Sequence, residues 1–558
     1  MKKSFLFTIL LLFLWQMNTM ACTNFIITKG ASSDGSVMIT YSADSHTLYG
    51  ELYFRPAMDY PEGAMVDVIE WDTGKLLGKI PQVRHTYSVV GNMNEHQVSI
   101  GETTFGGREE LGSQPGAIVD YGTLMYFALQ RAKNAREAIK VFGDLTAQYG
   151  YASSGESFSI SDANEAWILE MIGKGKVEKG AVWVARRIPD GYVSGHANHP
   201  RITQFPMNDP ENCIYSPDVI SFARKMGYFN GEDKEFSFSD TYAPLEFGGA
   251  RFCEARVWAM FNRINSTMGQ YQDYAMGKIE KGKYDYPTNR MPLWIKPDKK
   301  LSVHDVMELM RDHYEGTKMD MNNDIGAGPF ACPIRWRPMT WKVDSLGYVH
   351  ERATSTMQTG FVFVSQSRSW LPDWIGGIHW FGVDDTYTTA YSPMYCGMTK
   401  VPESFAEGNG SMLQYSPTSA FWTFNFVSNW AYTKWNYMIK DIQKVQRELE
   451  TGYIDEVTNK IDKEAASLMN TDKNKAREFL TNYSVNAGNG TVKRWQELGH
   501  YLLVKYIDGN VKKEKDGKFE DNGTGQAVMP SQPGYPEWWL REIVRGHGDI
   551  IKAPVINH

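Results

Sequence analysis

The sequence has few cysteines: five among 558 residues, at positions 22, 213, 253, 332 and 396. Structural zinc sites group their ligands in short motifs such as Cys-x-x-Cys, which this chain lacks, so we expect no metal and no cofactor. An odd number of cysteines leaves at least one without an intramolecular partner. We expect that one to be Cys22, and the other four to pair or stay buried: Cys213, Cys253, Cys332 and Cys396.

Long apolar runs and blocks of one charge are also missing. After residue 21 every apolar stretch is interrupted by charge, glycine or proline, which argues against a transmembrane segment in the mature chain. The formal net charge of −7 is spread along the sequence, so we expect no nucleic-acid partner. The aromatic content of 13% suits clefts for peptides, sugars or ring-bearing ligands.

The first residues have the order of a secretory signal. Two lysines precede an apolar core from Phe5 to Trp15, and a polar stretch then ends in the small residue Ala21. This order is typical of a signal peptide, and the core is too short to span a bilayer comfortably. We predict a signal peptide at residues 1–21, cleavage before Cys22, and a secreted or periplasmic protein of a bacterial envelope.

An N-terminal cysteine would carry a nucleophile and a base on one residue. A thiol has a pKa of about 8.5 and an α-amino group one of about 7.7 to 8.0. The amine can therefore take the thiol proton and return it to the leaving group when an acyl-enzyme forms. Before cleavage the same nitrogen is an amide and cannot act as a base. Export would then activate a cysteine hydrolase.

Two other readings of Cys22 stay open at this point. Bacterial lipoproteins also begin at a cysteine after a small residue, and lipidation would consume the thiol. Such signals usually carry a branched apolar residue such as leucine three positions before the cysteine, where this chain has Thr19. The cysteine could also be incidental to function.

The residues after Cys22 argue against an incidental cysteine. Residues 22–39 read Cys-Thr-Asn-Phe-Ile-Ile-Thr-Lys-Gly-Ala-Ser-Ser-Asp-Gly-Ser-Val-Met-Ile, two β-rich runs around a tight turn. This segment, with later ones at 93–103, 157–170 and 376–395, resembles the cysteine dipeptidase family of the N-terminal-nucleophile (Ntn) hydrolases, relatives of penicillin V acylase and bile salt hydrolase. The resemblance covers roughly residues 22–430.

The resemblance implies an α+β fold, a four-layer αββα Ntn-hydrolase sandwich. Apolar residues at helical spacing predict a helix within 120–149, which would lie in one of the outer layers. From about Thr418 the strand pattern gives way to helical spacing. We therefore expect a dipeptidase domain at 22–430 and a helical C-terminal extension at 431–558.

The resemblance also carries over catalytic positions. Besides Cys22, it implies Asp44 as an acidic residue near the nucleophile or its amine, and Asn198 as an orienting residue that could donate to the oxyanion. Arg251 matches an arginine whose charge favours the thiolate, with Arg256 close enough in sequence to be the true match. A turn carboxylate, an Asx turn and a surface ion pair are the ordinary alternatives for these positions.

The substrate side of the site departs from the relatives. They place an asparagine oxyanion donor where this chain has Glu102-Thr103-Thr104, so a backbone N–H or a threonine hydroxyl would have to substitute. Relatives also carry an arginine where Tyr41 stands, and tyrosine supplies no fixed positive charge. A peptide's free amine needs a carboxylate, for which Glu102 or Glu170 is the candidate.

The sequence therefore predicts an exported cysteine dipeptidase acting on dipeptides or short peptides. The alternatives are an amidase of the same fold, acting on N-acyl amino acids or bile-salt-type conjugates, and a non-catalytic lipidated surface binding protein. A homo-oligomer is left open.

Overall fold

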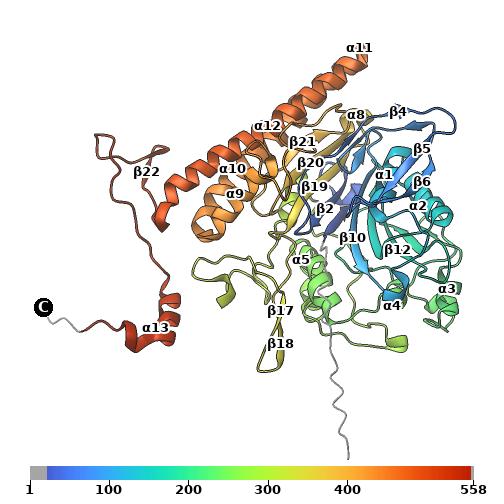
Figure 1. Ribbon diagram of the computed structural model, residues 1–558, viewed down its shortest axis with the longest axis horizontal. Helices are drawn as coiled ribbons and strands as arrows, with labels where there is room; N and C mark the ends of the chain where they lie inside the picture. The colour runs from blue at the N-terminus through green and yellow to red at the C-terminus, as the bar shows by residue number, and fades with distance from the viewer. Residues whose placement is uncertain (1–21, 555–558) are drawn as a thin grey trace, which may run out of the picture.

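Two large antiparallel sheets form the body of the protein (Figure 1). The computed structural model describes residues 22–554, so the predicted signal peptide, residues 1–21, lies outside the described residues. The seven-stranded sheet has the order β16 (Trp294–Ile295), β14 (Val193–His196), β1 (Asn24–Ile27), β2 (Val37–Asp44), β19 (Thr359–Ser367), β20 (Gly377–Val383) and β21 (Ser392–Tyr395). The eight-stranded sheet has the order β15 (Cys213–Tyr215), β13 (Ala181–Arg187), β12 (Ala166–Gly173), β11 (Gly155–Ser161), β10 (Ser99–Gly106), β9 (Met93–Asn94), β8 (Val89–Val90) and β3 (Phe54–Arg55).

The strands β1 and β2 place Cys22 at the start of a central strand. Ile26 pairs with Ile39 across the two antiparallel strands. The turn between them is held by Asp34, whose Oδ1 accepts hydrogen bonds from the Ser36 N–H at 3.0 Å and the Ser32 hydroxyl at 2.6 Å. The predicted pair of strands around a tight turn is therefore present.

The strand β1 is buried throughout because both of its faces are covered. Ile26 belongs to a core that also holds Ile168 of the eight-stranded sheet. Phe25 and Ile27, whose side chains point the other way, lie in a second core with α5 (Ala255–Ile264) and α7 (Val303–Leu309). Its one polar residue, Asn24, is buried as well, and its Nδ2 donates to the Glu102 carbonyl at 2.6 Å.

Helices cover the outer face of the eight-stranded sheet as well. The helix expected within 120–149 is in fact two helices, α1 (Tyr121–Arg131) and α2 (Ala135–Tyr149). The break has a local cause, because the Asn134 side chain accepts a hydrogen bond from the Glu137 N–H and starts a new helix there. Phe142 of α2 packs edge-to-face on Phe158 of β11 at 4.7 Å between ring centroids.

Shorter elements complete the body. Two-stranded ribbons are formed by β4 (Met58–Asp59) with β7 (His85–Thr86), β5 (Met65–Ile69) with β6 (Leu76–Pro81), and β17 (Thr340–Val343) with β18 (Leu346–Val349). Short helices are α3 (Val219–Lys225), α4 (Phe238–Tyr242), α6 (Gln272–Ala275) and α8 (Asp373–Gly376).

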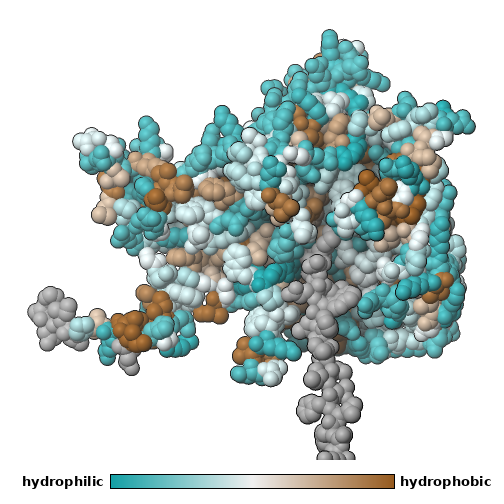
Figure 2. All heavy atoms as spheres, in the orientation of Figure 1, coloured by the Kyte–Doolittle hydropathy of each residue, from teal (hydrophilic) through white to brown (hydrophobic). Residues whose placement is uncertain are grey.

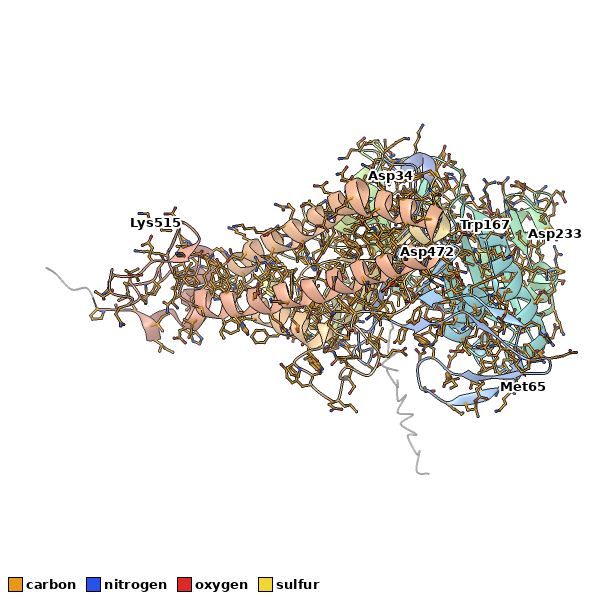
Figure 3. All side chains as sticks on the ribbon, turned by 90° about the horizontal axis from the view of Figure 1, so that it is seen from above. Asp34, Met65, Trp167, Asp233, Asp472 and Lys515 are labelled. Carbon is orange, nitrogen blue, oxygen red and sulfur yellow. The ribbon has the colours of Figure 1, made fainter. Side chains whose placement is uncertain are left out.

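The expected C-terminal helical region is present. It contains α9 (Ala420–Tyr432), α10 (Trp435–Glu456), α11 (Asp462–Thr471), α12 (Lys473–Tyr506), the ribbon of β22 (Glu514–Lys515) and β23 (Lys518–Phe519), and α13 (Glu537–Ile551). Figure 3 shows α12 running from Asp472 away from the sheets. Its first half is fastened to β21, since the Ser484 hydroxyl accepts a hydrogen bond from the Tyr395 N–H at 3.1 Å. The domain boundary predicted at residue 430 falls inside α9.

The surface of the C-terminal helix α13 bears on the expectation that the mature chain has no transmembrane segment. Apolar side chains of α13 gather on the surface (Figure 2), with Trp538 44% and Leu540 47% exposed. Even so, no helix among residues 22–554 is long and apolar enough to cross a bilayer.

All five cysteines lie in this range, and none is disulfide-bonded.

Candidate active site

Cys22 lies at the contact between the two sheets. In the full-length chain its side chain is buried, and its sulfur is 3.7 Å from the Tyr41 hydroxyl of β2 and 3.7 Å from Oε1 of Glu102 of β10. The next residue is fixed in the sheet, because the Ser42 N–H donates to the Thr23 carbonyl at 3.0 Å. The sulfur therefore has a fixed position between groups from two sheets.

Tyr41 and Glu102 form a close pair beside the sulfur. The Tyr41 hydroxyl donates to Glu102 Oε1 at 2.5 Å. The Tyr41 ring packs edge-on against Phe361 and Phe363, with centroids 5.6 and 5.7 Å away. Tyr41 therefore supplies a neutral hydrogen-bond donor where the resemblance led us to expect a cation.

The Cys22 thiol is protonated in this environment. Burial raises its pKa well above the usual range, and the negative charges of Glu102 and Asp44 raise it further. Hydrogen bonding with the Asp44 backbone and with the Tyr41 side chain acts in the opposite direction but is a smaller effect. A base must therefore remove the proton when the sulfur attacks.

Glu102 shares its surroundings with a second buried carboxyl group, Glu156 of β11. Burial raises the pKa of Glu102 to about 7, although its hydrogen bond with Tyr41 opposes the shift. Burial, followed by the charge of Glu102, raises the pKa of Glu156 well above its usual range. A second charge on this pair is costly, because both carboxyl groups are buried and the charge of Glu102 opposes ionisation of Glu156. The pair thus holds at most one negative charge at neutral pH.

Asp44 approaches Cys22 through its backbone, while its carboxylate points to other partners. Oδ2 accepts from Arg352 at 2.6 Å, and Oδ1 accepts from the Thr359 hydroxyl at 2.7 Å. Burial raises the pKa of Asp44, and the charge of Arg352 opposes that shift. The catalytic role predicted for Asp44 stays a prediction.

The arginine at the nucleophile is Arg256, and this corrects our choice of Arg251. Arg256 Nη1 donates to the Cys22 carbonyl at 2.6 Å and to the Thr23 hydroxyl at 2.7 Å. Arg251 instead pairs with Glu351. Arg251 lies in a π-helical segment, Gly249–Glu254, and Arg256 in the first turn of α5, and their side chains reach different partners.

Asn198 connects Arg256 to the end of β10. Its Oδ1 accepts from Arg256 at 2.8 Å, and its Nδ2 donates to the Thr104 carbonyl at 2.6 Å. Its backbone is left-handed, with φ of 59°. These contacts agree with an orienting residue, and the oxyanion role stays a prediction.

Two residues predicted to bind substrate, Thr103 and Glu170, hydrogen-bond to other groups of the protein. The Thr103 hydroxyl bonds to His196 Nδ1 at 2.7 Å, because successive side chains of β10 point to opposite faces and Glu102 takes the position near Cys22. Both Glu170 oxygens accept from the Ile202 backbone N–H, at 3.1 and 3.0 Å, and Oε1 also accepts from the Arg201 N–H. We therefore correct the prediction for Glu170, whose carboxylate anchors the loop after β14.

Comparison with known proteins assigns the family. The model of peptidase family C69 matches residues 21–448. The chain belongs to peptidase family C69. The predicted membership of a cysteine peptidase family is thereby confirmed, and with it that the chain is a peptidase.

Similar proteins cover most of this C69 peptidase. A probable dipeptidase of Salmonella dublin is 24% identical over 426 residues, which is 71% of this chain and 86% of that protein. A probable dipeptidase of Latilactobacillus sakei is 24% identical over 407 residues, 69% of this chain and 76% of its own length. A probable dipeptidase B of Streptococcus pyogenes serotype M1 is 22% identical over 527 residues, 91% and 96% of the two chains.

Two residues of the site in this C69 peptidase escaped the sequence analysis. Glu156 had a signal that could have been used, namely a carboxyl group in the buried strand β11, whose remaining residues are apolar, small or hydroxyl-bearing. Arg352 had none, because it lies 308 positions from its partner Asp44 in a loop without a motif.

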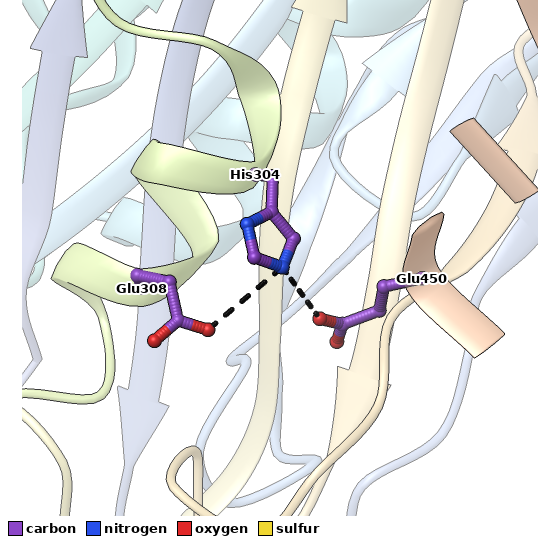
Figure 4. A group of neighbouring side chains, drawn as sticks. All are labelled: His304, Glu308 and Glu450. Carbon is purple, nitrogen blue, oxygen red and sulfur yellow. Dashed lines mark ion pairs between the residues drawn. The ribbon is translucent and has the colours of Figure 1, made fainter. Parts of the chain in front are cut away.

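Among the described residues, one group has the side chains and spacing of a metal site: His304, Glu308 and Glu450 (Figure 4). It already contains a cation, since Arg311 lies 2.5 Å from Oε1 of Glu308 and 2.5 Å from Oε1 of Glu450. The guanidinium bridges the two carboxylates, and none of these residues belongs to the site around Cys22.

Proposed function

We propose that this C69 peptidase is an exported cysteine dipeptidase whose nucleophile, Cys22, becomes the first residue when residues 1–21 are removed. The names of the similar proteins support the activity. The two antiparallel sheets that contact each other at Cys22, with helices on their outer faces, support the four-layer Ntn-hydrolase fold. The signal peptide predicted at residues 1–21 supports a secreted or periplasmic location.

The proposed mechanism uses two groups of Cys22, its thiol and its free α-amine. The free α-amine takes the thiol proton as the sulfur attacks the peptide carbonyl carbon. The amine then returns this proton to the leaving nitrogen, so the C–N bond breaks and a thioester forms. Water attacks the thioester with the amine again as base, which releases the acyl product and restores the thiol. The protonated thiol of the buried site makes this internal base necessary.

Arg256 and Asn198 are positioning residues in this scheme. Arg256 holds the Cys22 carbonyl, and Asn198 orients Arg256. Together they fix the backbone of the nucleophile, so the amine and the sulfur keep their relative geometry.

The observation that carries the dipeptidase over the amidase is the position of Glu102. The attacked carbonyl carbon must approach the sulfur to about 3 to 3.5 Å. In a peptide with a free N-terminus, the ammonium nitrogen lies about 2.5 Å from that carbon. Glu102 Oε1, 3.7 Å from the sulfur, is within reach of this ammonium group. An N-acyl substrate would instead place hydrocarbon against a buried carboxylate, which is unfavourable.

The test uses mature protein that begins at Cys22, confirmed by intact mass. We expect hydrolysis of Ala-Ala and no hydrolysis of N-acetyl-Ala-Ala or of a bile-salt conjugate. Cleavage of the acylated substrates with Ala-Ala untouched would favour the amidase. Partitioning of the natively exported protein into detergent, with Cys22 blocked and no turnover, would favour the lipidated binding protein.

A further inference from the structure

A small cavity near the site is lined by several charged side chains, among them Arg335, Arg337, Glu351 and Arg352. Three of the four have partners of opposite charge: Arg335 with Asp324, Glu351 with Arg251, and Arg352 with Asp44. The fourth, Arg337, forms no ion pair with any residue that the structure describes. The charge of Asp44 also acts on Arg337, but that carboxylate is already paired with Arg352.

The surroundings of Arg337 make an anion favourable there. Its side chain is half-buried and donates to the carbonyl oxygen of the buried Gln358 side chain. Burial, and then the neighbouring charge of Arg352, lowers the pKa of Arg337 to about 10. A partly desolvated cation beside other cations is costly until an anion joins it.

Arg337 is linked to the nucleophile by a short chain of contacts. The Gln358 side chain that accepts from Arg337 also donates to the Asp44 carbonyl at 3.3 Å. The Asp44 backbone in turn hydrogen-bonds to Cys22. In a dipeptide, the C-terminal carboxylate carbon is only three bonds beyond the attacked carbon, roughly 3 to 4 Å away.

We propose that Arg337 binds the C-terminal carboxylate of the substrate, an inference that rests on the proposed dipeptidase function. Glu102 then takes the ammonium end and Arg337 the carboxylate end, on opposite sides of the scissile bond. The separation of the two charges measures the length of the substrate. A third residue would move the carboxylate beyond Arg337, which restricts the enzyme to dipeptides.

The experiment compares Ala-Ala with Ala-Ala-NH2, whose C-terminus carries no charge. We expect the wild type to prefer the acid by about tenfold to a hundredfold in kcat/KM, the size of a hydrogen-bonded charge pair. Arg337→Gln should abolish this preference through a higher KM for Ala-Ala, with the amide unaffected. Arg337→Lys should keep part of the preference. Arg335→Gln is the matched control, because Asp324 already pairs with that guanidinium, and it should keep all of it.

The outcomes separate the two proposals. A wild type that cleaves both substrates equally well would overturn the inference without any variant, and so would an unchanged acid preference in folded Arg337→Gln protein. In both cases the dipeptidase function would stand. A wild type that cleaves neither substrate would overturn the proposed function, and this inference with it.

Discussion

The Tyr41 hydroxyl donates a 2.5 Å hydrogen bond to Glu102, and each of the two groups lies 3.7 Å from the Cys22 sulfur. The resemblance placed an arginine at the position of Tyr41. With a neutral donor there, the negative charge of Glu102 is not cancelled at the site. It stays available for a positively charged substrate group.

Tyr41→Phe should lower dipeptide turnover. The change removes the hydroxyl and leaves a buried carboxylate without this donor, at an expected cost of about 1 to 3 kcal/mol in the free energy of unfolding. We expect kcat/KM for Ala-Ala to fall by roughly tenfold or more, by the same energy. Tyr348→Phe, on the exposed hairpin of β17 and β18, is the control and should change neither quantity. Full activity in Tyr41→Phe would show that the pair has no part in catalysis.

Turnover should require the free α-amine of Cys22 as well as its sulfur. Cys22→Ala should abolish turnover, because it removes the nucleophile. A variant that retains one additional residue before Cys22 should also be inactive, since it keeps the thiol but converts the α-amine into an amide. Steady-state kinetics on protein of verified N-terminal mass checks both. An active extended variant would mean that another group serves as base.

Glu102→Gln should lower the activity on Ala-Ala and raise the stability of the folded protein at high pH. The pKa of Glu102 is raised by burial to about 7, so the folded state binds more protons than the unfolded state between about pH 4.3 and 7. The wild type should therefore lose stability as pH rises through this interval, and its KM for Ala-Ala should fall as the carboxylate forms.

Glu102→Gln should weaken both trends, with higher Tm at pH 8 relative to wild type and poor Ala-Ala hydrolysis. Thermal unfolding and kcat/KM, each measured from pH 5 to 8, provide the readouts. A pH profile of KM that is the same in variant and wild type would contradict the assignment of Glu102 to the ammonium group.

Arg256 and Arg251 should differ sharply when each is changed to glutamine. Arg256→Gln leaves the Cys22 carbonyl without its charged donor, so we expect kcat to fall by about a hundredfold. Arg251→Gln breaks an ion pair with Glu351 and should lower Tm with kcat retained. Arg256→Lys, which keeps the charge but loses the planar set of donors, should recover kcat only in part. Equal effects of the two glutamine variants on kcat would argue against a positioning role for Arg256.

Local sequence was sufficient for the central strands and for the nucleophile. The apolar runs of β1 and β2 and the turn residues Asp34 and Gly35 are short-range signals, and they place Cys22 at the beginning of a strand. The single helix predicted within 120–149 was wrong in detail, because the apolar periodicity of α1 and α2 continues across the cap at Asn134. Periodicity reports which face is buried but does not show where a helix is interrupted.

The sequence by itself determined the family, the candidate nucleophile and the pair of strands that follows it, because each can be recognised in short segments of the chain. Only the tertiary structure decided that Arg256 contacts Cys22, 234 positions away, and that Arg352 pairs with Asp44, 308 positions away. It also decided that Glu170 is used by a loop while Glu102 lies beside the sulfur. A charged side chain acts through the groups within a few ångströms of it, and packing of the two sheets brings those groups together.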